Sequence, residues 1–329
     1  MSKGVILLTT LYTGYNFGSS LQAFATKTII EELGFSCRLV SRKSIVKGRD
    51  IRIGKLLTIL LRTILTFNIK TINAYRKSYN KKMIGNSEGK FKQFENEFLN
   101  PIPLSWHGLR RYSSECVACV AGSDQIWDTT SLYVDPVYYL RFAPSFKRIS
   151  FSTSFGHNYI SEYNRTKLKK WIKEFESLSV RERSGVKIIE DLCNKEALHL
   201  LDPTLLINGD TWRAKFGIKR FTKRYILAYF LDPPSEHAKK YIEKKKQEYG
   251  CEVVGIPYQH SDMSYVDKMI ETGPIDFLEL VDNALVVITD SFHGTAFSIN
   301  LHTPFFVFNR NNGTVKTQNE KNYIYIRVF

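Results

Sequence analysis

Short apolar runs alternate along this chain with longer stretches whose apolar residues recur at helical spacing. The first run, Val5 to Leu8, precedes a loop with two glycines, and an amphipathic stretch then continues to Leu33. Ser19 or Ser20 is the expected cap of that helix, and an apolar run at 37–41 follows as a strand. The order strand, loop, helix, strand is typical of doubly wound α/β sheets.

The same alternation recurs in both halves of the chain. Further strands are expected at 116–122, 148–156, 178–182, 225–231, 251–257, 284–289 and 304–308, and helices at 161–175, 184–192, 234–249, 276–281 and from about 294. A proline follows Asp202 and is a natural boundary. We therefore predict an α/β protein with two Rossmann-like domains facing each other across a cleft. The first spans 1–205, with an inserted helical segment at about 44–105, and the second spans 220–329.

Ligands of open α/β sheets bind beyond the carboxyl ends of the strands, so the loops that follow those ends are the places where chemistry is expected. These loops come after Leu8, Val120, Phe151, Val180 and Thr289.

The turn at 290–295 concentrates polar side chains at the start of a helix. A helix N-terminus offers N–H groups and a positive dipole end, which suit a phosphate. Gly294 lets a ligand approach the backbone, Ser291 and Thr295 add hydroxyls, and His293 can move a proton or hold an anion. On these residues alone, an alternative stays open in which Ser291 only caps the helix and His293 only packs.

Six segments of the chain together resemble the polysaccharide pyruvyl transferase family, in the family's order and over most of the chain outside 41–110. They are GYNFGSSLQAFA, AGSDQIWD, SFSTSFG, SVRERSGVKIIEDL, LDPTLLI and TDSFHGTAFSINLHTPFFVF. The resemblance implies a fold similar to the B-type glycosyltransferases. It also implies transfer of the enolpyruvyl carbons of phosphoenolpyruvate to two sugar hydroxyls as a cyclic ketal, with phosphoenolpyruvate as donor substrate and no cofactor.

The resemblance also implies two catalytic residues. Arg181 matches an arginine that holds anionic groups of the substrate, for which a permanent bidentate donor is suited. Its alternative role is a salt bridge with Glu182 at the end of a strand. His293 matches the family histidine, but many members have an arginine before it where this chain has Phe292. Which cation replaces that arginine stays open.

Further residues are expected to bind substrate. Asn16 and Gly18 match the family's N-terminal loop, where the backbone is expected to approach the acceptor. Asp124 and Gln125 lie in a polar loop after a strand and are expected to contact the acceptor sugar or the second domain. Trp127 beside them suits stacking on a sugar ring or burial in the core.

The net charge of +15 is concentrated in one segment of the chain. Between Arg38 and Lys92 there are 15 basic residues against 2 acidic ones, an excess of +13. Within it, Ile51 to Lys82 has apolar residues at helical spacing, interrupted by charges that prevent it from spanning a bilayer. A basic amphipathic helix indicates binding to an anionic membrane surface, and a helical insertion packed on the first domain is the alternative. Nucleic acid is not expected as a partner, because its recognition signatures are absent.

Cysteine usage and the N-terminus favour a cytoplasmic protein. The five cysteines form no paired framework, and Cys116 and Cys119 lie in an apolar run, so we expect core residues and a reducing compartment. The apolar run at 5–8 is too short for a signal peptide. No His, Cys or carboxylate group has ligand spacing, so no metal is expected.

Together these features predict transfer of a pyruvyl group to two hydroxyls of a sugar in a bacterial surface polysaccharide precursor. Whether the acceptor is free or lipid-linked stays open, and a lipid-linked acceptor would bring the enzyme to the inner face of the plasma membrane. One alternative is a B-type glycosyltransferase that uses a nucleotide sugar, and another is a catalytically silent relative acting as a binding module. The sequence from 314 onward does not resemble the family's final helix, which indicates a shortened second domain and favours the silent alternative.

Overall fold

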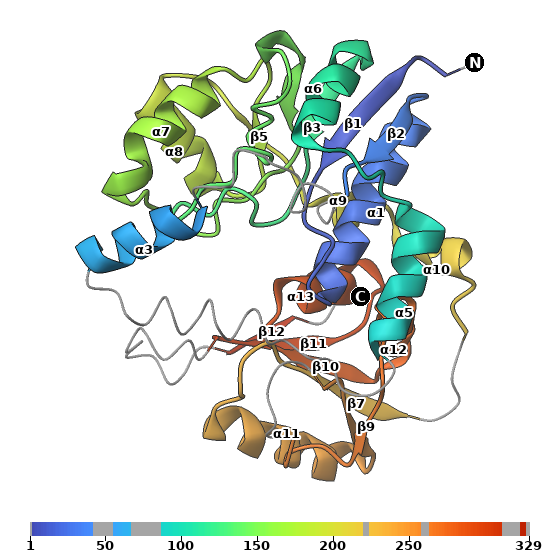
Figure 1. Cartoon of the computed structure of the whole chain (residues 1–329). Helices are drawn as coiled ribbons and strands as arrows, with labels where there is room; N and C mark the ends of the chain where they lie inside the picture. The colour runs from blue at the N-terminus through green and yellow to red at the C-terminus, as the bar shows by residue number, and fades with distance from the viewer. Residues whose placement is uncertain are drawn as a thin grey trace. The chain divides into compact units, whose positions relative to one another are not determined.

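A computed structural model describes residues 2–41, 55–66, 87–219, 224–257, 263–310 and 323–326. The chain divides into two compact units, each built on a largely parallel sheet with helices (Figure 1). Unit 1 comprises Met1–Thr13, Ser19–Asn80 and Glu95–Leu206, and unit 2 comprises Gly14–Gly18, Lys81–Phe94 and Ile207–Phe329. The predicted class of α/β protein with two Rossmann-like domains is confirmed. The short segments at 14–18 and 81–94 group with unit 2, although the sequence suggested that they belong to the first domain.

Unit 1 contains a parallel sheet in the order β2 (Ser36–Leu39), β1 (Val5–Thr9), β3 (Ala118–Ala121) and β4 (Arg148–Ser150). Beyond β4, isolated bridges lead to the parallel pair β5 (Ser179–Val180) and β6 (Leu198–His199). The helices that lie wholly in unit 1 are α3 (Lys55–Thr66), α6 (Trp106–Glu115), α7 (Glu162–Lys173), α8 (Arg183–Cys193) and α9 (Pro203–Leu206), with a π-helix at Glu95–Leu99 and a 3-10 turn at Ser145–Lys147.

Unit 2 contains a sheet in the order β12 (Tyr323–Ile326), β11 (Phe305–Phe308), β10 (Val286–Thr289), β7 (Tyr225–Tyr229), β8 (Glu252–Gly255) and β9 (Lys268–Met269). Among the described strands of this sheet, β12 alone runs antiparallel to its neighbour. Its helices are α5 (Ser87–Phe94), α10 (Gly209–Phe216), α11 (Glu236–Tyr249), α12 (Pro274–Asn283) and α13 (Phe292–Asn300). The central strands β7 and β10 are buried along their whole length, as expected of parallel strands covered on both faces.

The predicted strands and long helices are present, but several bounds differ, and the strand expected at 148–156 ends at Ser150. Helix α1 spans Phe17–Glu32, so it begins before Ser19 and Ser20, and neither serine is its cap. Helix α13 begins at Phe292 because the Ser291 side chain caps it.

The short segment at 14–18 is anchored in unit 2 by one aromatic residue. Phe17 is fully buried and stacks on Phe277 of α12, with ring centroids 5.0 Å apart and planes 8° apart. The rings of Tyr229 and Phe91 contact it from β7 and α5. Helix α5 is held to unit 2 in turn by an ion pair between Lys90 and Asp276 at 3.0 Å. Aromatic packing therefore fixes the first residues of α1 beside the unit 2 sheet.

The core of unit 1 shows where Trp127 and the two cysteines Cys116 and Cys119 lie. Trp127 is fully buried, stacks on Tyr139 and donates from Nε1 to the carbonyl of Tyr138 at 2.9 Å. It is thus a core residue, and the sugar-stacking alternative is wrong. Cys116 and Cys119 are also buried core residues, as predicted. Burial raises the pKa of the Cys119 thiol to about 12 and that of Cys116 to about 11, so both stay protonated.

Candidate active site

The turn after β10 is tied to the end of the neighbouring strand β7. The Thr289 hydroxyl donates to the carbonyl of Tyr229 at 2.6 Å. The carboxylate of Asp290 accepts the backbone N–H groups of Leu231 and Asp232, at 2.7 and 3.1 Å. Burial raises the pKa of Asp290, and these two N–H groups partly offset that effect. The Asp290 carboxylate therefore holds together the loops that follow the carboxyl ends of the adjacent strands β7 and β10.

Three of the predicted binding residues build the start of α13. The Ser291 hydroxyl accepts the N–H of Gly294 at 3.2 Å, and the Thr295 hydroxyl donates to the carbonyl of Ser291 at 3.0 Å. A Cβ on Gly294 would lie 2.7 Å from the Thr289 hydroxyl oxygen, so only glycine fits there. The capping role that the sequence left as an alternative for Ser291 is therefore present, and the same bonds hold the first turn of α13 in place.

His293 lies against the first turn of α1. Its side chain is buried, and a Cβ added to Gly18 would lie only 2.0 Å from Nδ1 of the imidazole. Gly18 is therefore required for the ring to occupy this position. Asn16, half-buried, immediately precedes the first residue of α1. The structure thus brings His293 and Gly18 together at the N-terminal ends of two helices, which is a suitable place for an anion.

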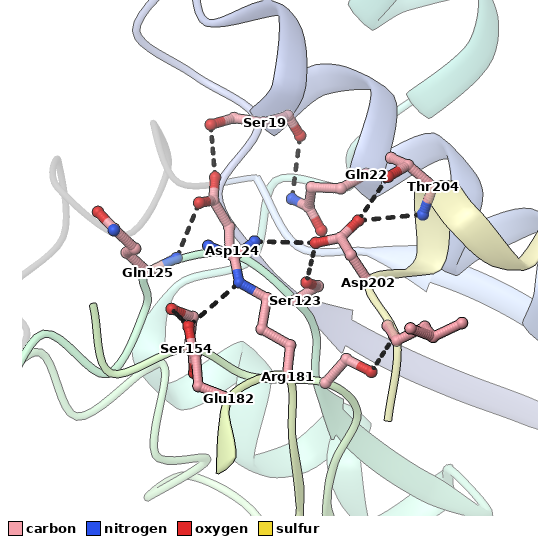
Figure 2. Close-up of polar contacts among 12 residues, drawn as sticks. Ser19, Gln22, Ser123, Asp124, Gln125, Ser154, Arg181, Glu182, Asp202 and Thr204 are labelled. Carbon is pink, nitrogen blue, oxygen red and sulfur yellow. Dashed lines mark hydrogen bonds and ion pairs between the residues drawn. The ribbon is translucent and has the colours of Figure 1, made fainter. Parts of the chain in front are cut away.

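Arg181 lies in unit 1, within a cluster of carboxylates (Figure 2). Its Nη1 donates to Asp202 Oδ2 at 2.8 Å, and its Nε donates to Glu182 Oε1 at 3.3 Å. Burial alone would lower the pKa of Arg181, but the carboxylates of Asp202, Asp124 and Glu182 raise it above its ordinary value. The salt bridge that the sequence offered as an alternative is present, and Asp202 is a second partner.

Hydroxyl groups complete this cluster. Asp202 is buried and also accepts bonds from the hydroxyl of Ser123, at 2.8 Å, and from the N–H and hydroxyl of Thr204. The Ser154 hydroxyl donates to Glu182. Figure 2 shows these groups gathered around the guanidinium of Arg181. Three carboxylates thus surround one guanidinium in unit 1, and hydroxyl donors stabilise the negative charge.

Asp124 and Gln125 occupy the edge of the same cluster. Asp124 Oδ2 accepts the hydroxyl of Ser19 at 2.5 Å, and Oδ1 accepts the N–H of Gln125 at 2.8 Å. The backbone of Asp124 is in the left-handed region, with φ of 80°, a conformation that costs on the order of 1–3 kcal/mol outside glycine. The Gln125 side chain is exposed, so it is the one of the pair that a sugar could reach.

Sequence reasoning missed Asp202 and Ser19 as members of this cluster. Asp202 was treated only as a boundary before a proline, although it follows β6 as Arg181 follows β5. Because β5 and β6 are parallel neighbours, residues just beyond their carboxyl ends meet at one edge, and this signal could have paired them.

In the part of the chain that the structure describes, no group of three His, Cys, Asp or Glu side chains is arranged to hold a metal ion. Nor does any described helix combine the length and the apolar character that crossing a bilayer requires.

The sequence model of the family described as polysaccharide pyruvyl transferase matches residues 16–312. The chain belongs to this family. The matched range contains every residue of the site, from Asn16 to Thr295. Membership of the polysaccharide pyruvyl transferase family indicates a transferase of polysaccharide biosynthesis that acts on a sugar acceptor.

The solved structures to which this chain is similar include two UDP-GlcNAc 2-epimerases and a glycosyltransferase. The UDP-GlcNAc 2-epimerase of Methanocaldococcus jannaschii is 12% identical over 92% of this chain and 82% of its own, with a TM-score of 0.47. That of Rickettsia bellii is 8% identical over 92% and 77%, with a TM-score of 0.42. The glycosyltransferase SnogD of Streptomyces nogalater is 9% identical over 94% and 82%, with a TM-score of 0.36. No protein with a curated description matches the chain.

Proposed function

We propose that this family member transfers the pyruvyl group of phosphoenolpyruvate to two hydroxyls of one sugar and forms a cyclic ketal. The sugar belongs to a precursor of a bacterial surface polysaccharide, such as a capsule or exopolysaccharide. The observation that carries the proposal is the packing of His293 on Gly18, in a chain that belongs to the polysaccharide pyruvyl transferase family. This contact joins two segments from opposite ends of the chain, and both segments resemble the family.

The donor is proposed to bind beside His293. Phosphoenolpyruvate carries a carboxylate and a phosphate, so its site needs positive charge and hydrogen-bond donors. The N-terminal ends of α13 and α1 each favour a nearby anion by about 0.3–1 kcal/mol. The first turn of α13 is kept rigid by Ser291, Gly294 and Thr295, so its N–H groups are already oriented before the donor arrives.

The chemistry needs one group that moves protons. The C3 carbon of phosphoenolpyruvate gains a proton and becomes a methyl group, while the first sugar hydroxyl attacks C2 and loses its own proton. Phosphate then leaves C2, and the second hydroxyl attacks the same carbon and releases its proton to the departing phosphate or to solvent. His293 is proposed to act as acid or base in these transfers, for which imidazole is suited near neutral pH.

The remaining residues have proposed roles that follow from the family resemblance. Arg181 is proposed to hold an anionic group of the donor, in addition to its bonds with Asp202 and Glu182. Gln125 is proposed to contact the acceptor sugar through its exposed amide, and the buried carboxylate of Asp124, which accepts the N–H of Gln125, is proposed to hold it in position. The backbone at Asn16 and Gly18 is proposed to border the acceptor.

The proposal needs neither a metal nor a cofactor, because the developing charges can be met by His293 and the helix ends. It places the enzyme in the cytoplasm, where cysteines such as Cys116 and Cys119 remain thiols, and where phosphoenolpyruvate is made. A lipid-linked acceptor would be met at the inner face of the plasma membrane.

The test is phosphate release from phosphoenolpyruvate in the presence of candidate acceptor glycans. Release that depends on the acceptor, with a new ketal methyl signal in the proton NMR spectrum of the glycan, is the expected result. In a parallel assay a nucleotide sugar replaces phosphoenolpyruvate. Its hydrolysis, or transfer of its sugar to the glycan, would instead support the glycosyltransferase alternative. Binding of the glycan without turnover of either donor would support a silent binding module.

A further inference from the structure

The helix α3 presents its apolar side to solvent. Five of its side chains are between 54% and 73% exposed, and they recur at the spacing i, i+3, i+4, i+7 and i+8 of a single helical face. We call them the α3 ridge: Leu57, Leu60, Leu61, Ile64 and Leu65. A contiguous apolar strip of this size is unusual on the surface of a soluble protein and marks an interaction site.

The polar side of α3 is the side that holds it to unit 1. The Arg62 guanidinium donates to the carbonyls of Leu132 and Tyr163 and to Oδ1 of Asn164, each at 2.8 Å. It also lies over the ring of Tyr163, and Thr63 is buried. The helix is therefore oriented by three hydrogen bonds from one arginine, and this orientation turns the ridge outward. The interpretation of α3 as an insertion whose apolar face is buried on the first domain is wrong for these residues.

The surroundings of the ridge are basic. The N-terminal residues of α7 bind Arg62, and the basic side chains of α7 are exposed: Arg165, Lys167, Lys169, Lys170 and Lys173. Glu162 is the single acidic residue of that helix. An apolar ridge in a positively charged setting is complementary to an anionic lipid surface rather than to a neutral one.

We propose that the α3 ridge inserts into the surface of an anionic membrane while the exposed basic residues of α7 contact lipid headgroups. A helix of 12 residues is about 18 Å long, too short for a hydrocarbon core of about 30 Å, so α3 lies in the interface plane. Salt screens the electrostatic attraction between the protein and the lipid headgroups. Insertion of apolar side chains adds a contribution to binding that salt does not remove. None of the ridge residues is among those proposed to bind the donor, and the test does not depend on catalytic activity.

Co-sedimentation of the full chain with vesicles tests the proposal. We expect binding to vesicles of phosphatidylglycerol and phosphatidylcholine, at least tenfold weaker binding to phosphatidylcholine alone, and residual binding at salt concentrations that screen surface charge. The variant Leu57→Ser/Leu61→Ser/Ile64→Ser should bind at least tenfold more weakly. The matched control Leu33→Ser/Leu198→Ser/Leu201→Ser removes three equally exposed leucines elsewhere in unit 1 and should bind within twofold of the original.

A second pair of variants tests the charge. Lys170→Glu/Lys173→Glu on α7 should weaken binding to the anionic vesicles, whereas Lys240→Glu/Lys244→Glu on α11 makes the same charge change on unit 2 and should not. Should the ridge variant fail to fold by circular dichroism, a dye-labelled Leu61→Cys protein replaces it. The dye should shift to shorter wavelength with anionic vesicles, and a dye at Leu201→Cys should not.

Unchanged vesicle binding by a folded ridge variant would overturn the proposal. So would a dimer in light scattering that becomes a monomer only in the ridge variant, because a second copy of the chain would then cover the ridge. Vesicle binding that salt abolishes completely and that the ridge substitutions do not change would be electrostatic only. That result would also overturn the proposal.

Discussion

The imidazole of His293 and the backbone of Gly18 are in such close contact that a methyl group on Gly18 would lie 2.0 Å from Nδ1. The two residues come from the first turns of α13 and α1, near opposite ends of the chain. The glycine is therefore the residue that decides where the proposed proton-transfer group stands.

Gly18→Ala should lower kcat by about 100-fold, because a displacement of about 1 Å at a reacting group has an effect of that order. The variant should also lose about 1–3 kcal/mol of stability, because a Cβ at 2.0 Å from Nδ1 and 2.2 Å from Cγ must displace a buried ring. The control is Gly108→Ala in α6, where the added Cβ would meet no atom closer than 3.4 Å and activity should stay intact. If the Gly18 variant keeps the kcat of the original protein, the contact between His293 and Gly18 has no role in the mechanism.

His293→Gln should lower kcat by about 10²- to 10⁴-fold and leave KM for phosphoenolpyruvate nearly unchanged, as expected for loss of a general acid or base. Steady-state phosphate release measures both constants. His237→Ala, an exposed histidine of α11, serves as the control and should behave like the original protein. A variant at 293 that loses affinity for the donor but keeps its turnover would show that the histidine only binds.

The sequence predicted the strands well because a parallel strand covered on both faces is apolar throughout. Strands β7 and β10 are of this kind, and their apolar runs ended close to the observed bounds. The amphipathic pattern of α3 was equally clear. Such a pattern predicts that the helix has an apolar face, but it does not predict whether that face packs against the protein or is exposed. Hydrogen bonds from Arg62 to α7 and to the loop at Leu132 orient the helix so that its apolar face is exposed. Periodicity along the sequence contains no information about these bonds.

The candidate site was predictable only in part for a related reason. The rule that ligands meet the carboxyl ends of strands identified the loops that hold Arg181, Asp124 and His293. The partners of these residues were not predictable. Asp202 lies 21 positions from Arg181, and Ser19 lies 105 positions from Asp124. Such pairs depend on how sheet and loops pack, whereas local spacing reports only neighbours along the chain.

Arg181→Lys should lower both thermal stability and donor affinity. Lysine keeps the charge but cannot donate to Asp202 and Glu182 in the planar geometry of a guanidinium, so about 1–3 kcal/mol of stability should be lost. KM for phosphoenolpyruvate should rise about tenfold, equivalent to about 1.4 kcal/mol, when it is measured well below the melting temperature.

Arg213→Lys in unit 2 is a matched control for this variant. Arg213 also binds a buried carboxylate, that of Asp282, through Nη2 at 2.7 Å, and it has no proposed contact with substrate. Its replacement should lower the melting temperature without changing KM. If the two variants behave alike, the role of Arg181 is confined to the carboxylate cluster.

Activity should survive removal of divalent metals. The expectation rests on the sequence, which has no carboxylate or histidine group at ligand spacing, and on a reaction whose charges His293 and two helix ends can meet. Phosphate release in excess EDTA should equal that in magnesium. Loss of activity with EDTA and its return with magnesium would require a metal in the reaction.

Glu174→Gln should destabilise unit 1 in a way that depends on pH. The Glu174 carboxylate binds both Arg141 and the buried Arg148, the latter with Nη1 to Oε2 at 2.6 Å. Burial alone would raise the pKa of Glu174, but the two arginines outweigh it and lower that pKa below its ordinary value. A carboxylate with a lowered folded pKa stabilises the fold above the pKa of the unfolded chain, and the effect is lost as pH falls through the folded pKa.

The free energy of unfolding, measured with urea, should therefore be about 1–2 kcal/mol lower for Glu174→Gln than for the original protein at pH 7. This figure is at the low end for a charged hydrogen bond, because the side chain is one-third exposed. The difference should shrink as pH falls below the pKa of glutamate in the unfolded chain, about 4.3, and through the lowered pKa of folded Glu174, where the carboxylate becomes protonated and resembles the neutral amide. Glu176→Gln, at an exposed neighbouring position, should leave the free energy of unfolding at pH 7 nearly unchanged. A difference for Glu174→Gln that stays constant from pH 7 to pH 3 would mean that shape and packing, rather than the two ion pairs, account for the loss.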